Sequence, residues 1–86
     1  MLRISRVAGR SSRTTLRVEG RIVAEWVAVL ERECRRALQA NRPVHLDLSG
    51  VTFIDGDGVA TLRQLGANDI EIIDCPEFIE ALLRAP

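Results

Sequence analysis

Residues 44–65 read VHLDLSGVTFIDGDGVATLRQL, and this stretch decides the fold. Residues 44–49 alternate between apolar and polar side chains, which is the pattern of a half-buried strand. Acidic residues interrupted by glycines follow at 55–58, and the segment from Val59 to Leu65 then predicts a short helix. His45 is the only histidine, and we interpret it as a partly exposed strand residue because no nucleophile stands at a clear spacing from it.

The segment before residue 44 predicts two strands and a helix. The strands are expected over residues 2–7 and 14–19, joined by a turn of small residues at 8–13. A helix is expected from about Val23 to Ala40, because its apolar residues recur at the spacing of one helical face. Pro43 follows, and proline disfavours helical geometry in the residue before it.

The segment after residue 65 predicts a brief strand over residues 70–73 and a terminal helix that begins near Pro76. The apolar stripe of this helix consists of Phe78, Ile79, Leu82 and Leu83. The stripe suits either the core or an interface, and we take the core as the default.

The seven elements follow one another in the order β-β-α-β-α-β-α. Strand–helix–strand units require right-handed crossovers, so this order predicts an α/β fold: a mixed sheet of about four strands with helices packed against it. A chain of 86 residues has room for one core, and we expect residues 1–86 to form a single domain.

The composition excludes several functions. The chain has no lysine, so a Schiff base or a P-loop lysine is excluded. Aromatic residues make up 3%, which predicts an aliphatic core and no nucleic-acid binding by base stacking. Residues 1–21 contain six arginines and one glutamate, whereas residues 43–86 contain two arginines and eight acids. We interpret the early arginines as solvated side chains on an edge hairpin.

Cys34 and Cys75 are too few and too far apart for a zinc knuckle or a disulfide scaffold. We expect two reduced thiols that serve as packing groups, and a bridge between them stays open as an alternative. The first residues lack an apolar run of signal-peptide length, and no stretch approaches the roughly 20 apolar residues of a membrane span. The sequence therefore predicts a cytoplasmic protein without membrane insertion.

Residues 55–58, Asp-Gly-Asp-Gly, are open to several interpretations. A calcium loop that began at Asp55 would need an oxygen ligand at 59, glycine at 60 and glutamate at 66, and the chain has none of these. An aspartyl-phosphate site resembling haloacid-dehalogenase-type phosphatases would use Asp55 as the nucleophile and Asp57 as the general acid/base. That family also needs a threonine after the second glycine and a lysine, and both are missing. In the structural interpretation, Asp55 or Asp57 simply caps a helix.

A further interpretation comes from resemblance. Residues 44–65, together with VEGRIVAEWVAVLERECRRAL at 18–38, resemble the STAS domain of bacterial anti-sigma factor antagonists. Those domains show a Leu-Asp-Leu strand, an apolar turn such as Val-x-Phe-Ile, and Asp-Ser-Ser-Gly at the start of a helix. The resemblance covers roughly residues 14–75, and the family's fold agrees with the element order above.

In that family, a kinase that doubles as an anti-sigma factor phosphorylates the second serine, and phosphorylation breaks the complex. Here Asp55 matches the motif aspartate, Gly56 replaces the first serine, Asp57 replaces the phosphorylated serine, and Gly58 matches the motif glycine. The resemblance therefore implies a switch position without a hydroxyl. Phosphoserine carries a charge of about −1.5 to −2, so Asp57 is a partial and permanent imitation of the phosphorylated state.

The resemblance implies a non-enzymatic protein-binding module centred on Asp55, Gly56, Asp57 and Gly58, with no catalytic residue, metal or cofactor. The expected partner is an anti-sigma factor of the serine-kinase-like ATPase type or another STAS protein, and the function is partner switching in transcription regulation. The alternative is an accessory subunit on the ATPase of a bacterial lipid-transporting ABC system. STAS domains usually add another strand and helix after the last elements here, so we expect an edge that favours a partner or a homo-oligomer.

Overall fold

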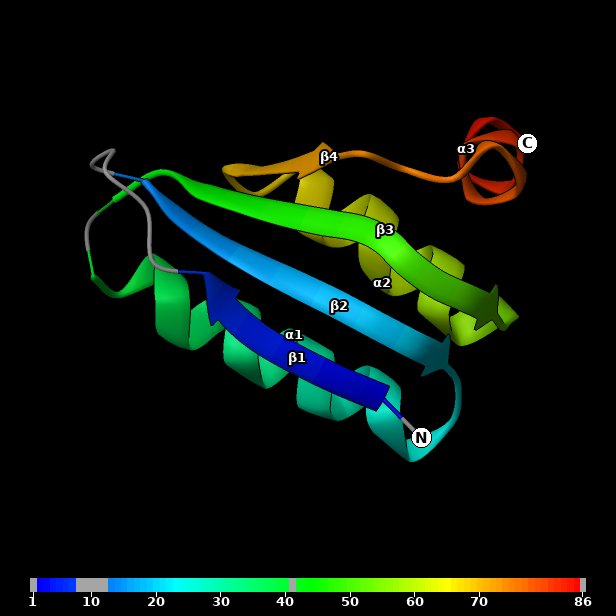
Figure 1. The fold of residues 1–86 in the computed structure, drawn as a ribbon. Coiled ribbons are helices and arrows are strands. Elements are labelled where there is room, and N and C mark those ends of the chain that lie inside the picture. The colour runs from blue at the N-terminus through cyan, green and yellow to red at the C-terminus, as the bar shows by residue number, and fades with distance from the viewer. Residues whose placement is uncertain (1, 8–12, 41, 86) are drawn as a thin grey trace.

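The computed structural model describes residues 2–7, 13–40 and 42–85 (Figure 1). Its strands and helices are β1 (Leu2–Val7), β2 (Thr14–Ile22), α1 (Glu25–Leu38), β3 (Val44–Ile54), α2 (Gly56–Gly66), β4 (Ile70–Ile73) and α3 (Glu77–Arg84). The predicted element order and the mixed α/β fold are confirmed. The turn predicted at 8–13 lies, except for residue 13, outside the described residues.

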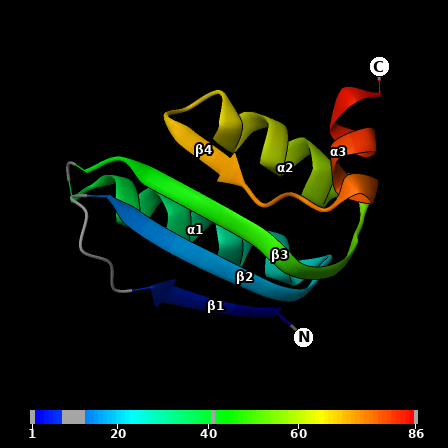
Figure 2. The same cartoon turned by 45° about the horizontal axis from the view of Figure 1, so that its top comes forward.

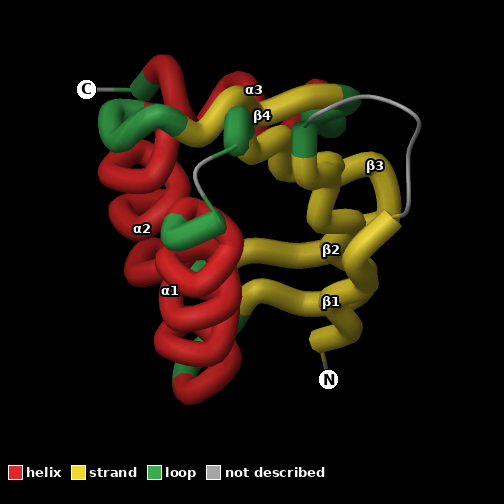
Figure 3. The backbone as a smooth tube through the Cα atoms, turned by 90° about the vertical axis from the view of Figure 1, so that its left-hand side faces the viewer, coloured by secondary structure: helices red, strands yellow, loops and turns green. Residues whose placement is uncertain are grey.

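The four strands form one sheet in the order β1-β2-β3-β4. β1 pairs antiparallel with β2, whereas β2 with β3 and β3 with β4 are parallel pairs. Each parallel step moves in the same direction across the sheet, so two right-handed crossovers place α1 and α2 on the same face (Figure 3). β1 and β4 are the two edges of the sheet, and they lie on opposite sides of the molecule (Figure 2).

Strands β2 and β3 are longer than predicted. The expected ends at residues 19 and 49 are wrong, because parallel pairing continues until Ile22 lies opposite Ile54. The register shifts twice along this pair, and Gly20 adopts a φ of 102°, a conformation that glycine tolerates. These irregularities interrupt the alternation of apolar and polar residues by which a strand is predicted.

The core is aliphatic, as predicted, and fills the layer between the sheet and the helices. Its largest fully buried side chains are Ile22, Leu30, Leu46, Leu48, Leu62, Ile79, Val18, Val44 and Cys34. The core default is wrong for Phe78 and Leu82, which are 44% and 41% exposed, whereas Leu83 is partly buried against the core. Helix α3 packs against α2 rather than across the sheet, so Ile79 is the α3 side chain that is fully buried.

Both cysteine thiols are free. Burial, with the nearby charge of Glu33, raises the pKa of the Cys34 thiol to about 12, and burial also raises the pKa of the half-buried Cys75 thiol. None of the described helices combines the length and the apolar character that a bilayer crossing requires.

Candidate functional site

Asp55 stands between strand β3 and helix α2 and caps the helix. Its Oδ1 accepts a hydrogen bond from the Gly58 N–H at 2.8 Å, and its extended backbone is that of an N-cap residue. The helix begins at Gly56, not at Val59 as predicted, so residues 56–58 form its first turn rather than a separate acidic turn. Of the two aspartates considered as a cap, Asp55 takes the role.

The second carboxylate oxygen of Asp55 reaches another part of the chain. Its Oδ2 accepts a hydrogen bond at 2.9 Å from the N–H of Ala24, the residue before α1. Ala24 has a φ of 47° and a ψ of −123°, a backbone conformation that favours glycine. Asp55 therefore joins the starts of α1 and α2. The bonds from the Ala24 and Gly58 N–H groups hold the pKa of Asp55 below its ordinary value.

The aspartyl-phosphate interpretation would use Asp55 as the nucleophile, and these two bonds show how its carboxylate is held. Both oxygens of Asp55 already accept backbone N–H groups, so the carboxylate is held as a structural cap. The part of the chain that the structure describes contains no group of three His, Cys, Asp or Glu residues arranged to hold a metal ion.

Gly58 is fixed by close packing. A Cβ atom at this position would lie 2.6 Å from Ile54 Cγ1 and 3.0 Å from both Ile22 Cγ2 and the Ile22 carbonyl oxygen. A Cβ atom at Gly56, in contrast, would have no neighbouring atom within 4 Å. The first turn of α2 therefore has one face held against β2 and β3 and another face open to solvent.

Asp57 lies on the open face of this turn and is exposed. Among the residues described, the ion pairs found involve other carboxylates. Asp57 borders a shallow groove of about 370 Å³ between the starts of α1 and α2, lined also by Ala24, Val27, Ala28, Glu31, Ala60 and Thr61. The structure thus brings the predicted residues 55–58 together with α1 residues that sequence reasoning missed. The link through Ala24 spans 31 positions, so no local pattern could reveal it.

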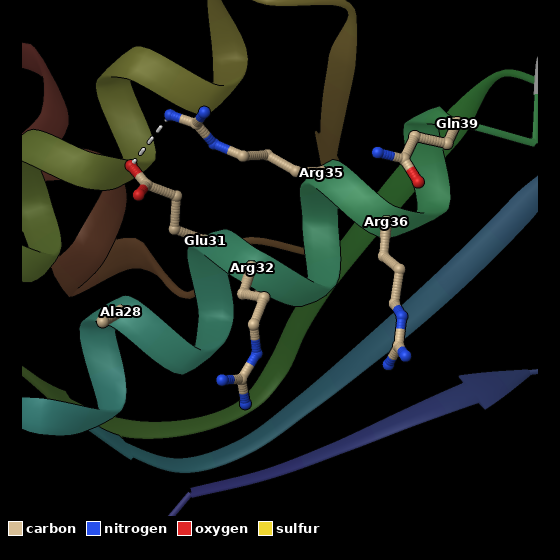
Figure 4. Close-up of a pocket in the computed structure, with 6 residues that line it drawn as sticks. All are labelled: Ala28, Glu31, Arg32, Arg35, Arg36 and Gln39. Carbon is tan, nitrogen blue, oxygen red and sulfur yellow. Dashed lines mark ion pairs between the residues drawn. The ribbon is translucent and has the colours of Figure 1, made fainter.

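A larger hollow, of about 720 Å³, lies along the outer face of α1 (Figure 4). Arg35 pairs with Glu31 at 3.6 Å, as the dashed line shows, and Arg36 pairs with Glu33 at 3.6 Å. These arginines are matched by glutamates of their own helix, so the hollow is lined by charges that the helix itself balances.

His45 and Asp47 lie on the sheet face that α1 and α2 leave uncovered. Nε2 of the half-buried His45 lies 3.2 Å from Glu71 Oε2, and this agrees with its prediction as a strand residue. Asp47 is buried; although burial raises its pKa, the Ser49 N–H bond and the Arg17 charge lower the pKa overall. Asp47 Oδ2 lies 3.6 Å from Arg17 Nε. Asp47 and Arg17 therefore form a cross-strand ion pair that is separate from the Asp55 site.

Solved structures with the same fold include two anti-sigma factor antagonists. One, from Mycobacterium paratuberculosis, is 17% identical with a TM-score of 0.71; the match covers 84% of this chain and 64% of that protein. SpoIIAA in its unphosphorylated form is 15% identical with a TM-score of 0.62 over 98% of this chain and 84% of that protein. Mglu is 24% identical with a TM-score of 0.64 over 81% of this chain but only 19% of its own length.

No curated protein matches the sequence of this chain significantly. The chain spans less than two thirds of the Mycobacterium protein, and all three structures are at most 24% identical to this chain. These likenesses therefore establish the fold alone. The family model described as "Mlab, STAS domain" matches residues 5–85, nearly the whole chain. The protein belongs to this family of STAS domains.

Proposed function

We propose that this protein is a non-enzymatic STAS module of the bacterial cytoplasm that binds one protein partner through Asp57 and the groove between α1 and α2. The observation that carries the proposal is the position of Asp57. Asp57 exposes a carboxylate on the first turn of α2. By the sequence resemblance, this is the position of the serine that is phosphorylated in anti-sigma factor antagonists. The partner is an anti-sigma factor of the kinase-like ATPase type, and the contact is part of transcription regulation.

The absence of a hydroxyl at residues 56–58 makes this binding state permanent. Phosphorylation breaks the complex in the antagonists that this chain resembles, but Asp57 carries −1 at most, whereas phosphoserine carries about −1.5 to −2. Asp57 therefore imitates the phosphorylated state only in part, and the partner that we propose accepts its single charge. The neighbouring Asp55 adds negative potential, but its oxygens are engaged by backbone N–H groups. Asp57 is then the acidic group of this turn that a partner can contact.

The groove also indicates the chemistry of the contact. Its lining includes the small side chains of Ala24, Ala28 and Ala60, and its acidic groups are Asp57 and Glu31. Glu31 already pairs with Arg35 at 3.6 Å. A partner segment with one basic side chain beside small apolar ones would complement this surface.

Affinity purification from the native cells, followed by mass spectrometry, tests the proposal. The baits are the wild-type chain, Asp57→Arg, and Glu33→Arg as a control with the same charge change on α1, outside the groove. We expect Asp57→Arg to weaken partner binding about tenfold or more, because like charges then meet at the contact. The control should bind like the wild type. A partner that is retained equally by all three baits contradicts the assignment of the surface.

The Asp57→Ser variant tests the imitation of phosphoserine separately. With the purified partner kinase and ATP, we expect this variant to accept phosphate, and its unphosphorylated form to bind the partner with a changed affinity. If the variant is not phosphorylated and binds as the wild type does, Asp57 does not imitate phosphoserine.

Two observations favour a second candidate, an accessory subunit on the ATPase of a lipid-transporting ABC system. A structural contact needs no switch, which agrees with the missing hydroxyl, and the matching family model is named for Mlab rather than for an antagonist. Recovery of transporter subunits with the wild-type bait would support this candidate. Recovery of a kinase-like ATPase or another STAS protein would support the first.

A further inference from the structure

The charges of this neutral chain are separated between the two edges of its sheet. The β1–β2 side carries five exposed arginines in the described residues, which are Arg3, Arg6, Arg13, Arg17 and Arg21. Residues 69–80, which include β4 and the start of α3, carry five exposed acids and no base, namely Asp69, Glu71, Asp74, Glu77 and Glu80. We call these the basic edge and the acidic edge. β1 and β4 each pair with one strand in the described sheet, so the outer backbone groups of both are open to a further strand.

Some of these charges have partners within the molecule. Arg17 pairs with Asp47, Glu80 with Arg84, and Glu71 lies near His45. In the described part of the chain, the ion pairs found do not include Arg3 or Arg6, the arginines of β1 itself. The basic edge therefore keeps cationic groups beside an open strand edge.

Like charges disfavour the symmetric pairings. Two β1 edges would bring arginine against arginine, and two β4 edges would bring acid against acid, and both arrangements are repulsive. The pairing that the charges favour is the basic edge of one copy against the acidic edge of another. Such a head-to-tail contact leaves one edge open at each end and continues into a chain of copies.

Strand direction and side-chain placement fit this contact. β1 runs opposite to β2, and β2, β3 and β4 run parallel, so a second copy in the same orientation would place its β1 antiparallel to β4. If Arg3 lies opposite Glu71, Leu2 and Ile4 share a face with Ile72 and Ile70. Ile4 and Ile72 are only partly buried in the single chain, and this contact would cover them.

We propose that this protein associates with further copies of itself head to tail, through β-strand pairing between the basic edge and the acidic edge. Neither edge includes residues 55–58, so the proposal stands apart from the function proposed above. Because the pairing depends on exposed charges, added salt weakens it.

Sedimentation velocity of the whole chain, over a range of concentrations at low and high salt, tests the proposal. We expect the mass to rise with concentration at low salt and to fall towards one copy at high salt. Arg3→Glu and Glu71→Arg should each weaken association about tenfold or more, since each places like charges across the contact. The double variant restores the charge pair in reverse and should associate again. Circular dichroism confirms that each variant is folded.

Arg32→Glu, on the exposed face of α1, is the matched control for a change in net charge. It should associate like the wild type. The proposal is overturned if the protein stays monomeric at low salt, if Arg32→Glu weakens association as much as Arg3→Glu, or if the double variant fails to associate. A mass that stops at two copies and does not respond to the edge substitutions also overturns it.

Discussion

Replacement of Gly58 by alanine would test the packing that fixes the start of α2. The new Cβ atom would lie 2.6 Å from Ile54 Cγ1 and 3.0 Å from Ile22 Cγ2. Ile22 is fully buried and Ile54 is 5% exposed, so neither side chain has room to move away. The third neighbour, the Ile22 carbonyl oxygen at 3.0 Å, accepts the Asp55 N–H and is held in place.

Overpacking of this kind destabilises a protein by about 1–3 kcal/mol. Alanine is favoured over glycine within a helix by roughly 1 kcal/mol, so we expect a net loss of up to about 2 kcal/mol for Gly58→Ala. Gly56→Ala is the matched control, since its Cβ atom would meet nothing within 4 Å. This control should be neutral or more stable by about 0.4–1 kcal/mol. Urea unfolding followed by circular dichroism measures both, and equal stability of the two variants would refute the close packing.

Three further predictions concern the same site and the two thiols. Ala24→Gly should raise the free energy of unfolding by about 1 kcal/mol, because a φ of 47° with a ψ of −123° strains alanine. Urea titration measures this change, and an unchanged unfolding midpoint would argue against the strain. Stability should fall as the pH drops through the ordinary carboxyl value of 3.8 and below it, because the folded-state pKa of Asp55 is lowered. Asp55→Asn should weaken this acid dependence in unfolding measured across pH, and an identical pH profile would contradict the lowered pKa. Iodoacetamide should label Cys75 before Cys34 in the native protein, because Cys34 is buried and burial raises its pKa to about 12. Mass spectrometry of timed samples measures the two labelling rates, and equal rates would contradict this burial.

The sequence predicts this fold where its patterns are regular and fails where they are interrupted. The alternation at residues 44–49 and the helical spacing over residues 23–40 place β3 and α1 correctly, because each pattern reports one buried face. Strand β3 nevertheless continues to Ile54, since the pairing with β2 is kept by shifts in register. A register shift depends on the partner strand, and a single sequence does not contain that information.

The site shows the same division between local and distant causes. The residues 55–58 stand out in the sequence, and either aspartate is a suitable cap by its type. The choice of Asp55 depends on its place at the end of β3, where one oxygen meets the Gly58 N–H and the other meets the Ala24 N–H. The sequence does not predict the exposure of Phe78 for a related reason. The apolar stripe of α3 is read correctly, but only the docking of α3 on α2 decides which residue of the stripe is covered.

The four residues 55–58 divide into two that hold the structure and two that face solvent. Asp55 and Gly58 are fixed, the first by two backbone hydrogen bonds and the second by contact with Ile54 and Ile22. Gly56 and Asp57 are exposed, and a side chain at position 56 would meet no atom within 4 Å. The positions at which the antagonist motif carries serine are therefore the two whose side chains are free of the fold. A chain can therefore lack both hydroxyls and keep the helix start unchanged, and in the function that we propose it keeps the binding surface without the phosphorylation switch.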